Sequence, residues 1–534
     1  MKNWIKFLFY FIPPAFLAQE NSISTNIPLS EDMNQVVDYW NIKTKELSFH
    51  SSFKPFLSRT ISKSADSAVC EFDHFQIWSY GASKVFNNQP EKRNPFRVQL
   101  LPIADVGIGY DVLERKIKRN LIGGVKASLF INDDFTFSST VFGGNISLPF
   151  YMDSMYKQNK VVPGYGRVYG ENETGYQVFD YTGYLSYSPG NNKYFNFQMG
   201  RDKHFVGDGY RSVLLSDYAN PYPFVRINAN VWRLQYNVWY TWMLDPTNAN
   251  HIKKSFTNKY AVFHYLSYNI IEELQIGFFE NVVWRGSDSN QVRSFDVNYL
   301  NPLVFFRPQE FAVGSPDNSF IGLNINAKLF NTIKLYGQLG LDEFFLKEIR
   351  ARNGWWANKQ AWQLGLKYIN AFSLKGLSLQ AEYNEIRPYT YTHGLVSQNY
   401  AHDALALAHP YGANLREFIS CINYRKGKWQ LSLRGNLLYL GKDTLASTSS
   451  NIGQNIYLSY TTRPYEYGHK TLQGDKNTIL QSDVKLVYLI LPQLNARLEI
   501  GYIQRSESST MKYKLENPFV YVAFKTSFWN FYND

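Results

Sequence analysis

Apolar and polar residues alternate along much of this chain, and the alternating stretches come in adjacent pairs. Residues 321–329 and 333–341 form one such pair, and residues 484–490 and 494–502 form another. A period of two residues places the two kinds of side chain on opposite faces of a β-strand. The short interruptions inside each pair predict tight turns between antiparallel neighbours.

The polar face of these stretches carries amides and charges, so it is expected to face water, and the apolar face is expected to face lipid. This pattern predicts an all-β protein, a closed antiparallel transmembrane β-barrel of the outer-membrane type. The residues expected to point outward are Leu323, Ile325, Leu335, Leu339, Leu486, Leu498 and Ile500. Those expected to point into the lumen are Asn324, Asn326, Asn495, Arg497 and Glu499.

Short and long connections between the stretches alternate, as they do in barrels with short periplasmic turns and long extracellular loops. Tight turns are predicted near residues 132–134, 189–193, 229–231, 269–271, 330–332, 370–372, 425–428 and 491–493. Long loops are predicted at 111–120, 148–175, 205–221, 244–258, 286–318, 343–358, 387–415, 441–478 and 505–517. Between Phe96 and Phe531 this gives about eighteen strands, the last paired with the first near residues 96–110.

The start of the chain indicates export. Lys2 and Lys6 precede an apolar run that ends near Ala18, so residues 1–18 are expected to be a signal peptide. Residues 19–95 lack sustained alternation and contain a helix-like patch at 31–39, which predicts a small periplasmic or plug segment. The barrel is expected to occupy residues 96–534, in the outer membrane of a Gram-negative bacterium.

Composition agrees with a barrel, although the mean hydropathy of −0.34 would suit a water-soluble protein. Half of each barrel strand is polar, and the 40 Tyr, 39 Phe and 12 Trp can supply aromatic girdles at both membrane interfaces. The net charge of +11 favours anionic partners, either lipopolysaccharide phosphates or acidic polysaccharide, rather than nucleic acid. A solvated charge excess without a partner is the alternative.

Two cysteines are present, Cys70 and Cys421. Export would permit a disulfide between the N-terminal segment and the barrel wall, but sequence alone fixes no pairing.

Five stretches resemble a known family of outer-membrane proteins. They are residues 200–224 (GRDKHFVGDGYRSVLLSDYANPYPF), 299–319 (YLNPLVFFRPQEFAVGSPDNS), 354–364 (GWWANKQAWQL), 387–414 (RPYTYTHGLVSQNYAHDALALAHPYGAN) and 49–56 (FHSSFKPF). They are similar to the Wzi family of capsule-assembly proteins, in the form found in Bacteroidota, which includes a gliding-motility protein. The resemblance implies an 18-stranded barrel with a small helical element on the periplasmic side.

For enterobacterial members the resemblance also implies a lectin-like role in holding capsular polysaccharide. Sugar binding needs aromatic faces and forked hydrogen-bond donors, and the motif stretches supply both. The candidate glycan-binding residues are Arg201, Lys203, His204, Arg211, Asp217, Arg307, Trp355, Trp356, Tyr391, His402 and His409. The alternative for each residue is an internal contact that holds a loop in place, because ion pairs are an ordinary use of buried charge.

The segment 205–221 contains Val213, Leu214 and Leu215, which need burial. It is therefore expected to fold inward or across the mouth of the barrel and to pack on Phe305-Phe306 and Trp355-Trp356. Such a fold would gather Arg201, Lys203 and Arg211 into one basic surface suited to an acidic glycan. The glycines at 207 and 209 are expected to serve backbone geometry.

Three functions remain open on sequence grounds. The first is a barrel that binds or helps assemble surface polysaccharide, and the second is a non-catalytic anchor in a gliding-motility or type 9 secretion complex. A diffusion porin is the third. An enzyme is not expected, because His402, Asp403 and His409 have no serine nucleophile in a recognisable elbow and no zinc-protease motif is present. Neither a cofactor nor a metal is expected.

Overall fold

The protein is described by a computed structural model that covers residues 24–61, 95–132, 134–157, 159–190, 194–250, 255–286, 295–301, 317–343, 345–443, 451–491, 494–511 and 513–534. The expected signal peptide (1–18), Cys70 and Arg307 lie outside these residues. Among the described residues, no helix is long and apolar enough to cross a membrane.

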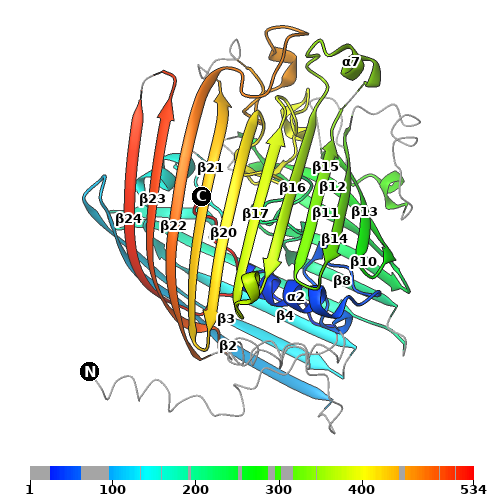
Figure 1. Cartoon of the computed structure of the whole chain (residues 1–534), viewed down its shortest axis with the longest axis vertical. Coiled ribbons are helices and arrows are strands. Elements are labelled where there is room, and N and C mark those ends of the chain that lie inside the picture. Colours follow the sequence, from blue (N-terminus) through cyan, green and yellow to red (C-terminus); the bar gives the residue numbers. More distant parts are fainter. Residues whose placement is uncertain are drawn as a thin grey trace.

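Eighteen long strands within the described residues form a closed antiparallel barrel, as the alternation predicts (Figure 1). They are β2 (Phe96–Asp111), β3 (Lys116–Ile131), β4 (Phe135–Ile146), β7 (Gly175–Tyr187), β8 (Phe195–Asp202), β10 (Tyr222–Val231), β11 (Leu234–Asn250), β12 (Ser255–Ile271), β13 (Leu274–Arg285), β14 (Asn318–Leu329), β15 (Ile333–Leu341), β16 (Gln360–Ile369), β17 (Leu377–Ile386), β20 (Leu415–Lys426), β21 (Trp429–Lys442), β22 (Asp475–Leu491), β23 (Ala496–Ser509) and β24 (Lys514–Lys525). The barrel closes where β24 pairs with β2, from Asp105 opposite Lys525 to Asp111 opposite Phe519.

The remaining elements are short and belong to the connections or to the lumen. The helices are α2 (Glu31–Thr44), α5 (Phe150–Tyr156) and α7 (Leu346–Ala351), with 3-10 turns η2 (Ser58–Thr60), η3 (Val297–Leu300), η4 (Ala371–Ser373), η5 (Val396–Gln398) and η7 (Tyr460–Thr462). The short strands are β1 (Phe53–Lys54), β5 (Val161–Val162), β6 (Gly166–Asn172), β9 (Phe205–Val206), β18 (Ala401–His402) and β19 (Leu405–Ala406).

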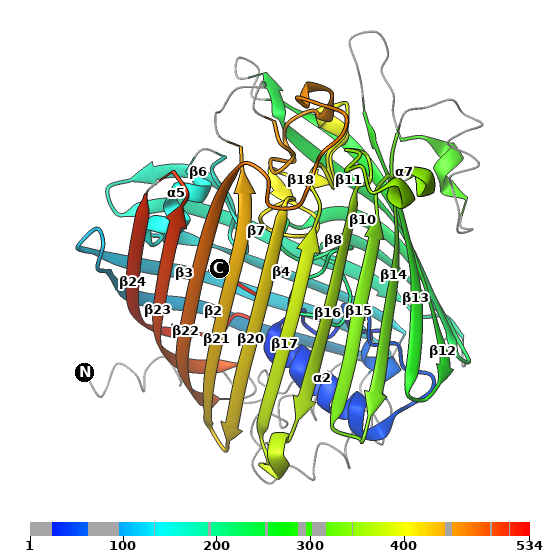
Figure 2. The ribbon, with the colours of Figure 1, turned by 45° about the horizontal axis from the view of Figure 1, so that its top comes forward.

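Most long connections gather at one end of the barrel, here called the loop end, and the short ones at the other, the turn end (Figure 2). Three predicted long loops are wrong. Strands β2 and β3 are joined by residues 112–115, β11 runs to Asn250 with β12 beginning at Ser255, and β23 and β24 are joined by 510–513. Polar residues at these positions continue the strands beyond the apolar band, so their composition resembles that of loops.

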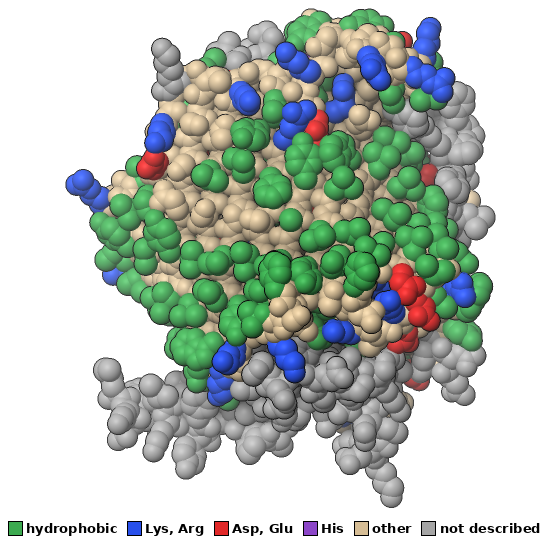
Figure 3. Space-filling model, viewed as in Figure 1, with side chains coloured by type: hydrophobic (Ala, Val, Ile, Leu, Met, Phe, Trp, Pro, Cys, Tyr) green, Lys and Arg blue, Asp and Glu red, His purple; other side chains and the backbone are tan. Residues whose placement is uncertain are grey.

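The predicted orientation of the side chains is confirmed. Leu323, Ile325 and Leu486 are exposed on the outer wall, whereas Asn324 and Glu499 are buried on the inner face. Figure 3 shows the outward apolar side chains as a belt, with most Lys and Arg above or below it. One-residue alternation therefore sorts the wall into a lipid face and a lumen face.

The lumen is filled by protein from both ends of the described sequence. Helix α2 is capped at its N-terminus by Ser30, whose hydroxyl accepts a hydrogen bond from Met33 N–H, and it lies inside the turn end of the barrel (Figure 1). Its apolar side packs on Ile369 of β16 and on Val487 and Leu489 of β22. Its polar side is bound to the wall, with Asp38 paired to Lys334 and Lys367, and Asp32 paired to Arg425.

The last strand ends earlier than predicted. Residues 526–534 leave the wall after Lys525 instead of extending the strand to Phe531, and they run into the lumen. Trp529 stacks on Phe142, and the Tyr532 hydroxyl donates to the carboxylate of Asp217. Cys421 is buried on the lumen face of β20 without a disulfide partner among the described residues.

A charged residue on the lipid face should destabilise the barrel most strongly at mid-membrane. Leu498 is only the third residue of β23, so Leu498→Arg should cost less than a mid-membrane substitution. Val484 lies near the middle of β22, and Val484→Arg should lower the free energy of unfolding by about 2–4 kcal/mol. Urea unfolding in phospholipid vesicles measures both, with Val484→Leu as the control. Equal stability of Val484→Arg and Val484→Leu would contradict the assigned lipid face.

Candidate functional site

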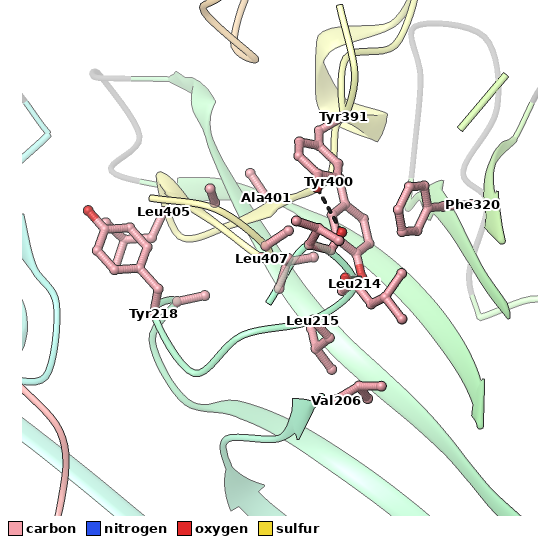
Figure 4. Close-up of a cluster of buried hydrophobic side chains, with 14 of the residues drawn as sticks. Val206, Leu214, Leu215, Tyr218, Phe320, Tyr391, Tyr400, Ala401, Leu405 and Leu407 are labelled. Carbon is pink, nitrogen blue, oxygen red and sulfur yellow. Dashed lines mark hydrogen bonds between the residues drawn. The ribbon is translucent and has the colours of Figure 1, made fainter. Parts of the chain in front are cut away.

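The segment 203–221 between β8 and β10 folds into the lumen, as its apolar residues predict, and is called here the inward fold. Val213, Leu214 and Leu215 are completely buried. Tyr391 and Tyr400, which descend from the 387–414 loop, donate hydroxyl hydrogen bonds of 2.7 Å to the carbonyls of Val213 and Leu214 (Figure 4). The inward fold is thus held from above by this loop.

The predicted packing of the inward fold on Trp355 and Trp356 is wrong. Val213, Leu214 and Leu215 share one buried cluster with Phe320, Tyr391, Tyr400 and Leu407, whereas Trp356 belongs to a separate cluster with Trp355 packed against it. Phe305 and Phe306 lie outside the described residues. The 387–414 loop supplies apolar neighbours of the inward fold in place of the two tryptophans, and the short strands β18 and β19 pair as a hairpin within it.

Asp208 connects the inward fold to both the N-terminal segment and the wall. Its carboxylate accepts hydrogen bonds from Ser51 Oγ (2.7 Å), Ser52 Oγ (2.5 Å) and Lys334 Nζ (2.6 Å). Burial alone would raise the pKa of Asp208, but Lys334 and Lys54 hold it well below its ordinary value. The carboxylate is therefore ionised, and Lys334 shares its charge with Asp38 of α2 at 2.9 Å.

The two glycines beside Asp208 serve backbone geometry. Gly207 has a φ of +140°, and a Cβ there would lie 2.4 Å from Gln338 Nε2. A Cβ at Gly209 would lie 2.4 Å from Glu382 Oε2. Glycine thus lets this bend approach the side chains of the wall closely enough for Asp208 to reach Lys334.

Arg211 occupies the centre of a buried ionic group. Its Nη2 lies 3.1 Å from Glu417 Oε1 on β20 and 3.3 Å from Asp534 Oδ2. His409 Nε2 donates to the other Glu417 oxygen at 2.7 Å. Arg211 thereby joins the inward fold, the wall and residues 526–534, and its side chain is closed off from solvent.

Other candidate residues are also engaged inside the lumen. Lys203 Nζ donates to the backbone carbonyl of Asp217 (2.9 Å), whose side chain is bound by Tyr532 and Asn530. His204 packs among Phe53, Tyr222, Phe224 and Trp239. Burial, with a smaller contribution from Lys259, lowers the pKa of His402 to about 3, so its neutral ring accepts a hydrogen bond from Leu244 N–H.

Arg201 has a different location from the other basic residues of its motif. It pairs across the sheet with Gly183 and Pro223, in phase with the exposed Met199, so it belongs to the outer face of β8. Its guanidinium stacks on Tyr181 and bonds Asp180. The prediction that Arg201, Lys203 and Arg211 gather into one polar surface is therefore wrong.

Trp355 and Trp356 form an aromatic cluster at the loop end, called here the loop-end cluster, with Tyr389, Tyr460, Tyr465, Tyr467, His469, Arg387 and Arg463. The ring centroids of Trp356 and Tyr460 are 4.7 Å apart, and the Arg463 guanidinium lies 4.1 Å from the Trp356 ring. His469 stacks on Tyr465 at 4.4 Å. Tyr465 and Tyr467 are about half exposed, at 47% and 52%.

Five members of this cluster come from residues 451–474, for which the sequence predicts only a long loop, and they are Tyr460, Arg463, Tyr465, Tyr467 and His469. The segment PYEYGH at 464–469 places aromatic residues beside a glycine and a basic flank, and this was the available signal. Of the predicted site residues, the structure places Trp355 half-buried and Trp356 buried in the loop-end cluster and brings seven others into the lumen. Their role in glycan binding stays a prediction. Among the described residues, no group of three His, Cys, Asp or Glu side chains is arranged to hold a metal ion.

The closed antiparallel barrel of eighteen long strands has the fold of an outer-membrane β-barrel. Wzi of Escherichia coli, an outer-membrane protein involved in group 1 capsule assembly and a carbohydrate-binding β-barrel, has a similar fold, with a TM-score of 0.58 and 10% sequence identity over 94% of this chain and 99% of Wzi. OprD of Pseudomonas aeruginosa is more distant, with a TM-score of 0.42 and 11% identity over 80% of this chain and 93% of OprD. Neither a family model nor a curated protein matches the sequence.

Arg211→Ala should destabilise the folded protein without changing its lipid face. The substitution removes the cation that lies between Glu417 and Asp534 and leaves only His409 and the more distant Arg434 beside them, and breaking a buried ion pair in this way costs about 3–5 kcal/mol. Urea unfolding in vesicles measures the loss, and Arg350→Ala on the exposed helix α7 is the matched control. Equal stability of the two variants would show that the group is not a structural connection.

Proposed function

We propose that this chain resides in the outer membrane of a Gram-negative bacterium, with its loop end outside, and binds or helps assemble surface polysaccharide there. The loop-end cluster carries the proposal. It combines exposed aromatic rings with arginine side chains, and these supply stacking surfaces and forked donors for a glycan.

The similarity to Wzi supports the barrel fold on which the proposal depends. Wzi is a carbohydrate-binding β-barrel, and this suggests a carbohydrate as the class of ligand. The cationic side chains of the cluster favour a glycan that bears carboxylates. Arg387 supports this ligand class because its Nε is buried without a hydrogen-bond partner among the described residues. The net charge of +11 also favours an anionic glycan.

A diffusion porin is less consistent with the filled lumen. Helix α2, the inward fold and residues 526–534 occupy the space that a porin leaves to water. A cavity of about 240 Å³ remains between them and the wall, lined by side chains such as Arg434, Asp483 and Lys485. A cavity of this size holds on the order of twenty water molecules.

One observation favours the alternative of an anchor in a gliding-motility or type 9 secretion complex. Phe345, Leu346 and Ile349 are exposed on and beside helix α7, a short loop-end helix with no buried residue. Exposed apolar side chains of this kind are typical of protein contact sites. The proposed membership of the Bacteroidota branch of the Wzi family, with similarity to the gliding-motility protein RemB, rests on the sequence motifs. In both roles the protein is non-catalytic and needs no cofactor.

Replacing the two half-exposed tyrosines, Tyr465→Ala with Tyr467→Ala, should weaken binding to surface polysaccharide about ten-fold, because each aromatic contact contributes roughly 0.5–1.5 kcal/mol. Binding of the purified full chain to polysaccharide from the same bacterium can be measured by biolayer interferometry. Retention of the polysaccharide on whole cells is the second measurement.

The matched control is Tyr169→Ala, which removes an exposed tyrosine from β6, outside the cluster. Unchanged binding by the double variant would overturn the proposed site. If the double variant keeps its polysaccharide but Phe345→Ser with Ile349→Ser abolishes gliding or secretion, the anchor role replaces the proposal.

A further inference from the structure

The outer wall of the barrel carries a row of directly paired residues at its loop-end margin. From β16 to β22 the row reads Trp362, Glu385, Arg416, Tyr439 and Thr478, each opposite the next. Lys476 lies one outward position beyond Thr478, and its ammonium is 5.2 Å from the centroid of the Tyr439 ring. Arg416 and Lys476 therefore flank Tyr439 on the membrane-facing side.

The spacing of charges along β20 gives the depth of this row. Arg416 and Lys426 are the two outward cations of the strand, ten residues apart, with Phe418 and Ile422 exposed between them. At a rise of about 3.3 Å per residue and a tilt of about 40°, ten residues span about 25 Å along the membrane normal, the height of the apolar band. Arg416 thus lies at the outer boundary of the band, at the level of lipid headgroups.

Aromatic residues mark the same level. The rings of Trp362 and Tyr383 lie 5.0 Å apart on the outer wall beside Glu385. At the other margin, Trp429 and Tyr488 lie 4.7 Å apart close to the turn end. Paired girdles of Trp and Tyr are typical of the two membrane interfaces.

The geometry leaves cationic donors directed outward. Nε and Nη2 of Arg416 donate to Glu385 at 3.0 and 3.2 Å, and Glu385 also accepts from Tyr383 and Thr471. This fixes the guanidinium while Nη1 makes no bond within the described part of the chain. Lys476 likewise has no carboxylate partner among the described residues, and its side chain is exposed.

We propose that Arg416, Tyr439 and Lys476 bind a phosphomonoester of an outer-leaflet glycolipid, the phosphorylated lipid A headgroup. A guanidinium fixed by Glu385 and an exposed ammonium suit a phosphate group, which accepts several charge-assisted hydrogen bonds. The Tyr439 ring between them can pack on the sugar that carries the phosphate. This site lies on the lipid face and is independent of the loop-end cluster and of its proposed polysaccharide.

The test uses the full chain in detergent micelles doped with bisphosphorylated lipid A, with bound lipid counted by native mass spectrometry. Arg416→Ala with Lys476→Ala should weaken lipid A binding about twenty-five-fold. This corresponds to about five-fold, or about 1 kcal/mol, for each cation. Lys426→Ala, which removes an outward cation of the same strand at the turn-end margin, should leave binding within two-fold. Arg416→Lys with Lys476→Arg should retain most of it.

Several results would overturn the proposal. Lipid A stripped of its phosphates should bind more weakly than the phosphorylated lipid, because the site recognises the phosphate group. Equal binding of the two lipids would show that the acyl chains are what the protein retains. An effect of Lys426→Ala as large as that of the double variant would assign it to general surface charge. Displacement of lipid A by millimolar inorganic phosphate would assign the site to a free anion, and displacement by the purified polysaccharide would assign it to the glycan.

Discussion

The structure depends on one buried charge, the carboxylate of Asp208. It accepts hydrogen bonds from Ser51 and Ser52 of the N-terminal segment and from Lys334 of the wall, and Lys334 in turn binds Asp38 of α2. Three parts of the chain that are distant in sequence meet at this point. Because an unpaired buried charge is so costly, each part needs the others in place, and the lumen is filled cooperatively.

The filled lumen decides where function can lie. In an open barrel, water satisfies the polar groups of the inner face, but here protein groups do so, as Asn326 Nδ2 and Gln338 Nε2 show by donating to Asp208 and to the Val206 carbonyl. The inner wall is therefore largely committed to internal contacts. The surfaces left for partners are the two ends of the barrel and the outer wall, and these carry the exposed aromatic and basic side chains.

Most strands of the wall and the orientation of their side chains could be predicted from the sequence. A period of two residues is a local pattern, and it assigns each side chain to one face of the sheet. The outward position of Arg201 could also be predicted from the sequence, since it continues the alternation of the outward residues Phe195, Phe197 and Met199. The ends of the strands could not be predicted, because the strands continue beyond the membrane with polar residues that resemble those of loops. The partners of Arg211 could not be predicted either: they come from β20 and from Asp534, more than two hundred residues away, and only the closed barrel brings them together.

The connection between the plug and the loop end gives the filled lumen a role beyond occlusion. Tyr391 and Tyr400 tie the 387–414 loop to the inward fold, and Tyr389, two residues before Tyr391, packs edge-on against Trp356 of the loop-end cluster. The loop-end cluster is therefore connected through the 387–414 loop to the inward fold, which contains Asp208. A surface held in this way loses little conformational entropy when a ligand binds, so rigidity supplied from the lumen favours recognition at the mouth.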